Sequence, residues 1–109
     1  MKYLAAVLFL GSAVAMAAGA TRISGYISDA HCSATHTSKS PNEACVKKCI
    51  QGGSAPVFVD DASNAVWKID NPDLVKDHYG HHVRVTATVN NTDKSIHITK
   101  VAMLPAGGQ

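Results

Sequence analysis

Alternation of apolar and polar residues is clearest in the second half of the chain, where it predicts a β-strand. From Val83 to Val89 every second residue is apolar, and the residues between them are Arg or Thr. A period of two indicates a strand with one buried face. Shorter stretches rich in β-branched and apolar residues predict four further strands, at residues 21–28, 56–60, 65–70 and 95–104.

The last of these strands contains an irregularity. Its apolar residues change parity between Ile98 and Val101, so they cannot all face the same side of a regular strand. One extra residue in the strand would restore a common face. We therefore expect a β-bulge near Thr99 or Lys100.

A helix is predicted between the first and second strands. Ser40 is a favourable N-cap, Pro41 suits the first helical position, and Glu43 completes a capping box three residues after Ser40. Gly52 or Gly53 is expected to end the helix, which would then be about ten residues long.

These elements predict an all-β (mostly) fold. A shorter helical turn is expected at residues 71–80, between the third and fourth strands. Five strands with a helical element at this place follow the order of the OB-fold. The expected architecture is a five-stranded OB-like Greek-key barrel with one short helix inserted after the first strand.

The N-terminal twenty residues are typical of a secretory signal peptide. Lys2 precedes an apolar run at residues 3–10, and small residues favour cleavage after Ala17 or Ala20. The run is shorter than the roughly 20 apolar residues that a membrane span needs, so no stable membrane anchor is expected. The sequence thus predicts a single domain at residues 21–109 in a secreted or periplasmic protein.

Composition narrows the classes of function. The 109-residue chain has ten Lys and Arg against eight Asp and Glu, and Lys2 lies in the predicted signal peptide. A nearly neutral domain lacks the basic surface of a nucleic-acid-binding protein, so no nucleic acid is expected as partner. Catalytic signatures such as a Ser-His-Asp arrangement or a phosphate loop are not visible, which favours binding over catalysis.

The chemistry of the chain is concentrated around its three cysteines. Cys32, His36, Cys45 and Cys49 have the spacing C-x3-H-x8-C-x3-C. Cys45 and Cys49 are four residues apart on the predicted helix and should share one face. Cys32 and His36 on the preceding loop can complete a Cys3His ligand set, which suits a thiophilic ion such as zinc or cuprous copper.

Two neighbours of Cys32 are further candidates. His31 is a substitute ligand because it adjoins the first cysteine. Asp29 is expected to cap the loop or to orient His36 from outside the ligand set, as carboxylates beside metal-binding histidines do. His78, His81 and His82 are expected to be exposed polar residues.

Two other interpretations of the cysteines remain open. A secreted small domain commonly uses cysteines in disulfides, here Cys32 with Cys45 or Cys49, leaving one free thiol. The protein would then be a disulfide-stabilised module that binds an unknown protein or small ligand without a metal. Thiol redox chemistry is the third interpretation, and it is weakened because C-x3-C is not the redox C-x2-C spacing.

The chain resembles a small secreted bacterial family with an OB-like fold and no established activity. The resemblance rests on GYISDAHC, which fits G-x-[IV]-[ST]-D-x-x-C, on a following histidine, on CVKKCIQGG and on GHHVRVTA. It extends over nearly the whole predicted domain. The residues that match the family pattern are Gly25, Asp29, Cys32, His36, Cys45 and Cys49. Ala87 departs from the pattern, which often has glycine there, and His81 and His82 stand where basic residues are expected.

Overall fold

The computed structural model of the protein describes residues 19–105. The predicted signal peptide lies outside this range except for its last two residues, as do residues 106–109. The described elements are β1 (Thr21–Asp29), η1 (Ser33–Thr35), α1 (Glu43–Gln51), β2 (Pro56–Asp60), β3 (Val66–Ile69), η2 (Pro72–Val75), β4 (His82–Asn90) and β5 (Ser95–Met103).

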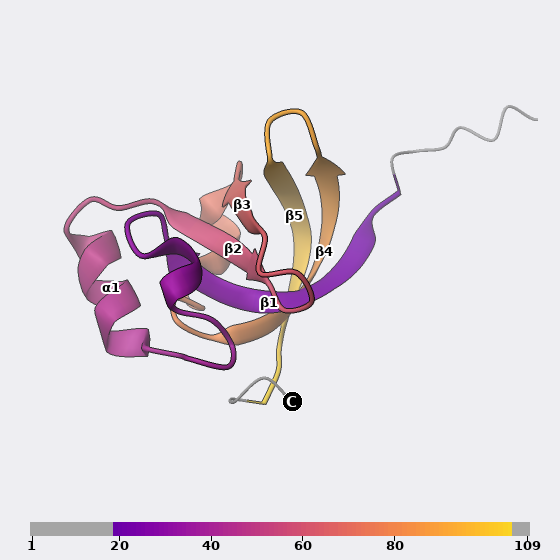
Figure 1. Ribbon diagram of the computed structural model, residues 1–109. Coiled ribbons are helices and arrows are strands. Elements are labelled where there is room, and N and C mark those ends of the chain that lie inside the picture. Colours follow the sequence, from indigo (N-terminus) through magenta and orange to yellow (C-terminus); the bar gives the residue numbers. More distant parts are fainter. Residues whose placement is uncertain (1–18, 106–109) are drawn as a thin grey trace, which may run out of the picture.

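The five strands of the described residues form one sheet that closes on itself. The hydrogen-bonded order is β1-β2-β3-β5-β4, and β4 pairs in turn with β1. All neighbours are antiparallel except β3 and β5, which are parallel and share only the pairs Lys68↔Ser95 and Ile69↔Ile96. Figure 1 shows α1 and the segment that follows β1 lying together on one side of this ring. The predicted mostly-β class, the five strands and the helix after the first strand are confirmed.

Strand β4 supplies the centre of the core, as its alternation predicts. Val83, Val85 and Ala87 are fully buried, Val89 packs against them, and Arg84 on the opposite face is exposed. Their partners in the core come from every other strand and from η2: Ile27, Phe58, Ile69, Val75, Ile96 and Ile98.

The predicted bulge in β5 is present at Thr99. Thr86 pairs with Lys100, whereas the next residue, Ala87, pairs with Ile98. Thr99 is therefore the extra residue, and its hydroxyl donates a hydrogen bond to the carbonyl of Thr86 at 3.2 Å. The bulge allows Ile98 and Val101 to pack against the same core.

Strand β1 departs from simple alternation in its second half. From Gly25 to Asp29 both faces are buried, because η1 and α1 cover the outer face of the strand there. Tyr26, 1 % exposed, accepts a hydrogen bond on its Oη from the backbone N–H of Asn42 at 3.0 Å. Gly25 is needed in this strand, because a Cβ at that position would lie 2.4 Å from the ring of Phe58.

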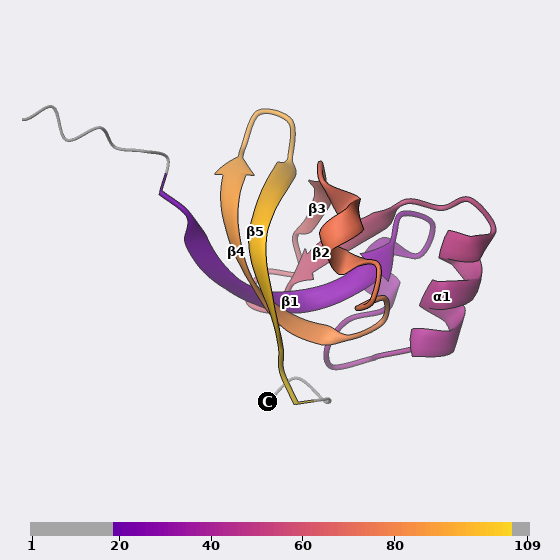
Figure 2. The ribbon, with the colours of Figure 1, turned by 180° about the vertical axis from the view of Figure 1, so that it is seen from behind.

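Helix α1 begins two residues later than its predicted start. The prediction of Ser40 as N-cap was wrong: the N-cap is Asn42, whose Oδ1 accepts a hydrogen bond from the backbone N–H of Cys45 at 3.0 Å. Ser40 instead closes a tight turn with Thr37 through paired backbone hydrogen bonds. The helix ends at Gly52, as expected, and Gly53 follows with a φ of 109°. Seen from behind in Figure 2, α1 remains well away from the loop that joins β4 to β5.

Candidate metal site

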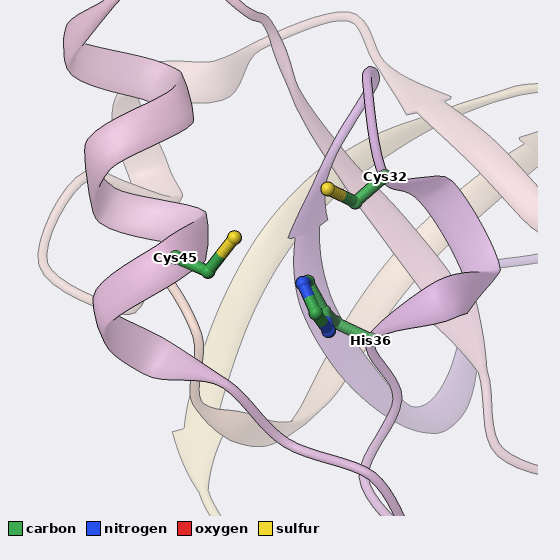
Figure 3. A group of neighbouring side chains, drawn as sticks. All are labelled: Cys32, His36 and Cys45. Atoms are coloured by element: carbon green, nitrogen blue, oxygen red, sulfur yellow. The ribbon is translucent and has the colours of Figure 1, made fainter.

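The candidate ligands come from three neighbouring elements. Asp29 is the last residue of β1, and Cys32 and His36 flank the short helix η1. Cys45 and Cys49 lie one turn apart on α1, and both are partly buried. Figure 3 shows the Cys45 sulfur directed from the helix towards the loop that carries Cys32 and His36. All the candidate ligands therefore come from one continuous segment, which runs from the end of β1 to α1.

The first group of converging side chains consists of Cys32, His36 and Cys45. One ligand atom from each lies within 4.8 Å of the others, and all three residues are partly buried. Two ligands on one tetrahedral zinc ion are separated by about 3.8 Å when metal–sulfur bonds are about 2.3 Å. The observed limit of 4.8 Å is about 1 Å above that spacing.

A second group consists of Asp29, Cys32 and Cys49, again within 4.8 Å of one another. Cys32 belongs to both groups, so its sulfur lies close to that of Cys45 in one group and to that of Cys49 in the other. The sulfurs of all three cysteines thus gather in one place. All three are free thiols, so no disulfide staples this segment.

Hydrogen bonds hold the loop that carries the first cysteine. Oδ2 of Asp29 accepts from the backbone N–H groups of His31 and Cys32, at 3.1 and 3.0 Å. The Ser28 hydroxyl donates to the carbonyl of Ser33 at 2.8 Å. Asp29 therefore caps the loop, which is one of its two expected roles. Among the described residues it forms no hydrogen bond with His36, the other role expected of it.

Burial and neighbouring groups disfavour the thiolate forms of Cys32 and Cys49 when no metal is bound. Burial, the charge of Asp29 and the two neighbouring thiols raise the pKa of Cys32 to about 11. Burial, followed by Asp29 and Cys45, also raises the pKa of Cys49. A metal ion must displace these protons to bind, because the thiolate is the ligand.

Two histidines considered in the sequence analysis, His31 and His82, lie outside the two converging groups. His31 is exposed and belongs to neither converging group of the described residues. The expectation that His82 is exposed was wrong: it is 5 % exposed, with its Nε2 2.7 Å from Asp61 Oδ2 and its Nδ1 2.6 Å from the carbonyl oxygen of Pro105. No local pattern indicates this burial, because His82 shares the outward parity of Arg84 and is covered by residues distant in sequence, Asp61 after β2 and Pro105 after β5.

His81 is involved in a contact that the sequence analysis missed. Its Nε2 lies 2.7 Å from Oε1 of Glu43, and Lys47 binds the same oxygen. Lys47 and then His81 lower the pKa of Glu43. The contact ties the start of α1 to the residue before β4 and so helps to fix the helix that carries Cys45 and Cys49.

Comparison of the chain with protein-family models, with curated proteins and with solved structures gave no match. Among the residues that the structure describes, no helix combines the length and the apolar character needed to cross a membrane.

Proposed function

We propose that this protein binds a thiophilic metal ion through Cys32, His36 and Cys45, with Cys49 adjoining them. One observation carries the proposal: a ligand atom of each of the first three residues lies within 4.8 Å of the others. Two sulfurs and an imidazole nitrogen form a soft ligand set, which suits zinc or cuprous copper.

The surroundings support a binding role. The helix that carries Cys45 is capped at both ends, by Asn42 and Gly52, and these caps stabilise it without a metal. The loop that carries Cys32 is held by the carboxylate of Asp29. The site is therefore largely formed in advance, which reduces the ordering cost that binding must overcome.

The test is a competition titration on the metal-free chain from residue 21 onward. Zinc, and separately cuprous ion under reducing conditions, is added in the presence of a chromophoric chelator of known affinity. We expect His36→Asn and Cys45→Ser each to weaken binding at least tenfold, since each removes a direct ligand. His97→Asn is the matched control, because His97 pairs with Asp70 on the surface and belongs to neither group. Unchanged affinity in both ligand variants, or no uptake by the wild type, would contradict the proposal.

We further propose that the closed sheet is an OB-like Greek-key barrel. The strand order, the parallel pairing of β3 with β5 and the position of η2 between β3 and β4 support this assignment. An experimental structure with a different strand order would refute it.

The N-terminal pattern supports a secreted or periplasmic location. Mass spectrometry of protein from its native host is expected to show removal of the residues up to Ala17 or Ala20. Detection of the intact N-terminus would contradict secretion through this segment. We propose a metal ion as partner, or else a protein or small ligand still to be identified.

A further inference from the structure

Asp29 is a buried carboxylate whose charge is not balanced by a cationic side chain. It is 0 % exposed, and the ion pairs among the described residues do not include it. Its Oδ2 accepts two backbone hydrogen bonds, but its Oδ1 is buried without any partner in the described part of the chain. Burial of an ionised group without compensation is costly, so this oxygen indicates that a cation binds beside it.

The side chains around Asp29 are suited to such a cation. A carboxylate oxygen of Asp29 and the sulfurs of Cys32 and Cys49 lie within 4.8 Å of one another. This group shares only Cys32 with the group of Cys32, His36 and Cys45. The segment therefore offers two triads of ligands with one sulfur in common.

Charge also favours more than one ion. When the site is loaded, the three cysteines are thiolates and Asp29 is a carboxylate, which gives four negative charges, while His36 is neutral as a ligand. One divalent ion would leave two negative charges uncompensated in a partly buried cluster. Two divalent ions would balance them.

We infer that the site holds two divalent ions bridged by the sulfur of Cys32. His36 and Cys45 complete the protein ligands of one ion, and Asp29 and Cys49 complete those of the other. Asp29 is then a direct ligand as well as the cap of its loop. Because each ion lies about 2.3 Å from the shared sulfur, the two ions must be less than about 4.6 Å apart. The inference rests on the proposed function, since it adds a second ion to the same site.

The number of bound ions tests the inference. Metal-free protein from residue 21 onward is loaded with zinc, freed of excess metal and examined by native mass spectrometry. We expect two zinc ions in the wild type and one in Asp29→Asn and in Cys49→Ser. The asparagine variant keeps an oxygen that can accept the N–H bonds of His31 and Cys32, so the loop should persist while the charge is lost. Asp73→Asn, a change at an exposed position of η2, is the control and should retain two ions.

The outcomes separate this inference from the proposed function. A wild type that binds no zinc refutes both. A wild type that binds one ion, or one that keeps two ions after both Asp29→Asn and Cys49→Ser, refutes the bridged pair alone. X-ray absorption of the wild type gives a second measurement that does not depend on variants. A zinc–zinc distance below about 4.6 Å should appear between one and two equivalents of zinc, and its absence at two equivalents overturns the inference.

Discussion

At the scale of single residues, the site includes groups whose surroundings disfavour their charged form. The thiols of Cys32 and Cys49 lose much of their contact with water and face the charge of Asp29, so their pKa values rise. A bound cation would reverse both effects. The residues that make the metal-free cluster costly are thus the ones that would make it a strong ligand set.

The raised pKa of Cys32 predicts how the stability of the metal-free protein depends on pH. In the unfolded chain this thiol titrates near its ordinary value of 9.0, whereas in the folded protein its pKa is about 11. Between these values the unfolded state binds fewer protons than the folded state, so the free energy of unfolding falls as pH rises. Below pH 9.0 this contribution is fully present.

Urea unfolding with a reductant and a chelator at several pH values between neutrality and pH 10 measures this dependence. Cys32→Ser should show a smaller decline, and the decline should not vanish, because the pKa values of Cys49 and Tyr26 are also raised. An equal decline in wild type and variant would show that Cys32 does not have the raised pKa.

At the scale of elements, the start of α1 determines where Cys45 and Cys49 lie. The Asn42 side chain caps the helix by accepting from the N–H of Cys45 itself. We expect Asn42→Ala to reduce the free energy of unfolding by about 1 kcal/mol, the usual cost of losing an N-cap. Ser40→Ala is the matched control and should change it by less than about 0.5 kcal/mol. Thermal and urea unfolding of the two variants check this. A larger loss of unfolding free energy in the Ser40 variant would show that Ser40, and not Asn42, caps the helix.

The strands, the helix and the candidate site differ in how far local sequence patterns predict them. Alternation located the strands, and the parity change between Ile98 and Val101 located the bulge, because both express the two-residue period of a strand. The start of the helix was misplaced because Ser40 and Asn42 are both good N-caps, and the turn with Thr37 decides between them. The cysteine spacing predicted one set of Cys32, His36, Cys45 and Cys49, of which the first three converge while Cys49 groups with Asp29 and Cys32. The burial of Asp29 among the ligand atoms and the burial of His82 depend on segments that fold over them, which no local pattern records.

At the scale of the whole molecule, the ring has one weak seam. β3 and β5 share two residue pairs, whereas β4 and β5 share eight. The backbone bonds that close this seam include those from Lys68 to the carbonyl of Lys94 and from Asp70 to that of Ile96. Local opening should therefore begin between β3 and β5.

Native-state hydrogen exchange followed by NMR tests this. The amides of Lys68 and Asp70 are expected to exchange through openings of lower free energy than amides in the middle of β4, such as that of Val85. The opposite order would place the weak point of the ring elsewhere.

The candidate ligands are close in sequence, and this affects the order in which the molecule assembles. They all lie between Asp29 and Cys49, whereas ring closure must bring Thr21 beside Ala87. Contacts of short sequence separation close smaller loops and form earlier in folding. An ion bound by this cluster would thus act on a chain whose ring is still open. It would fix the end of β1 against α1 and serve as a nucleus on which the later strands condense.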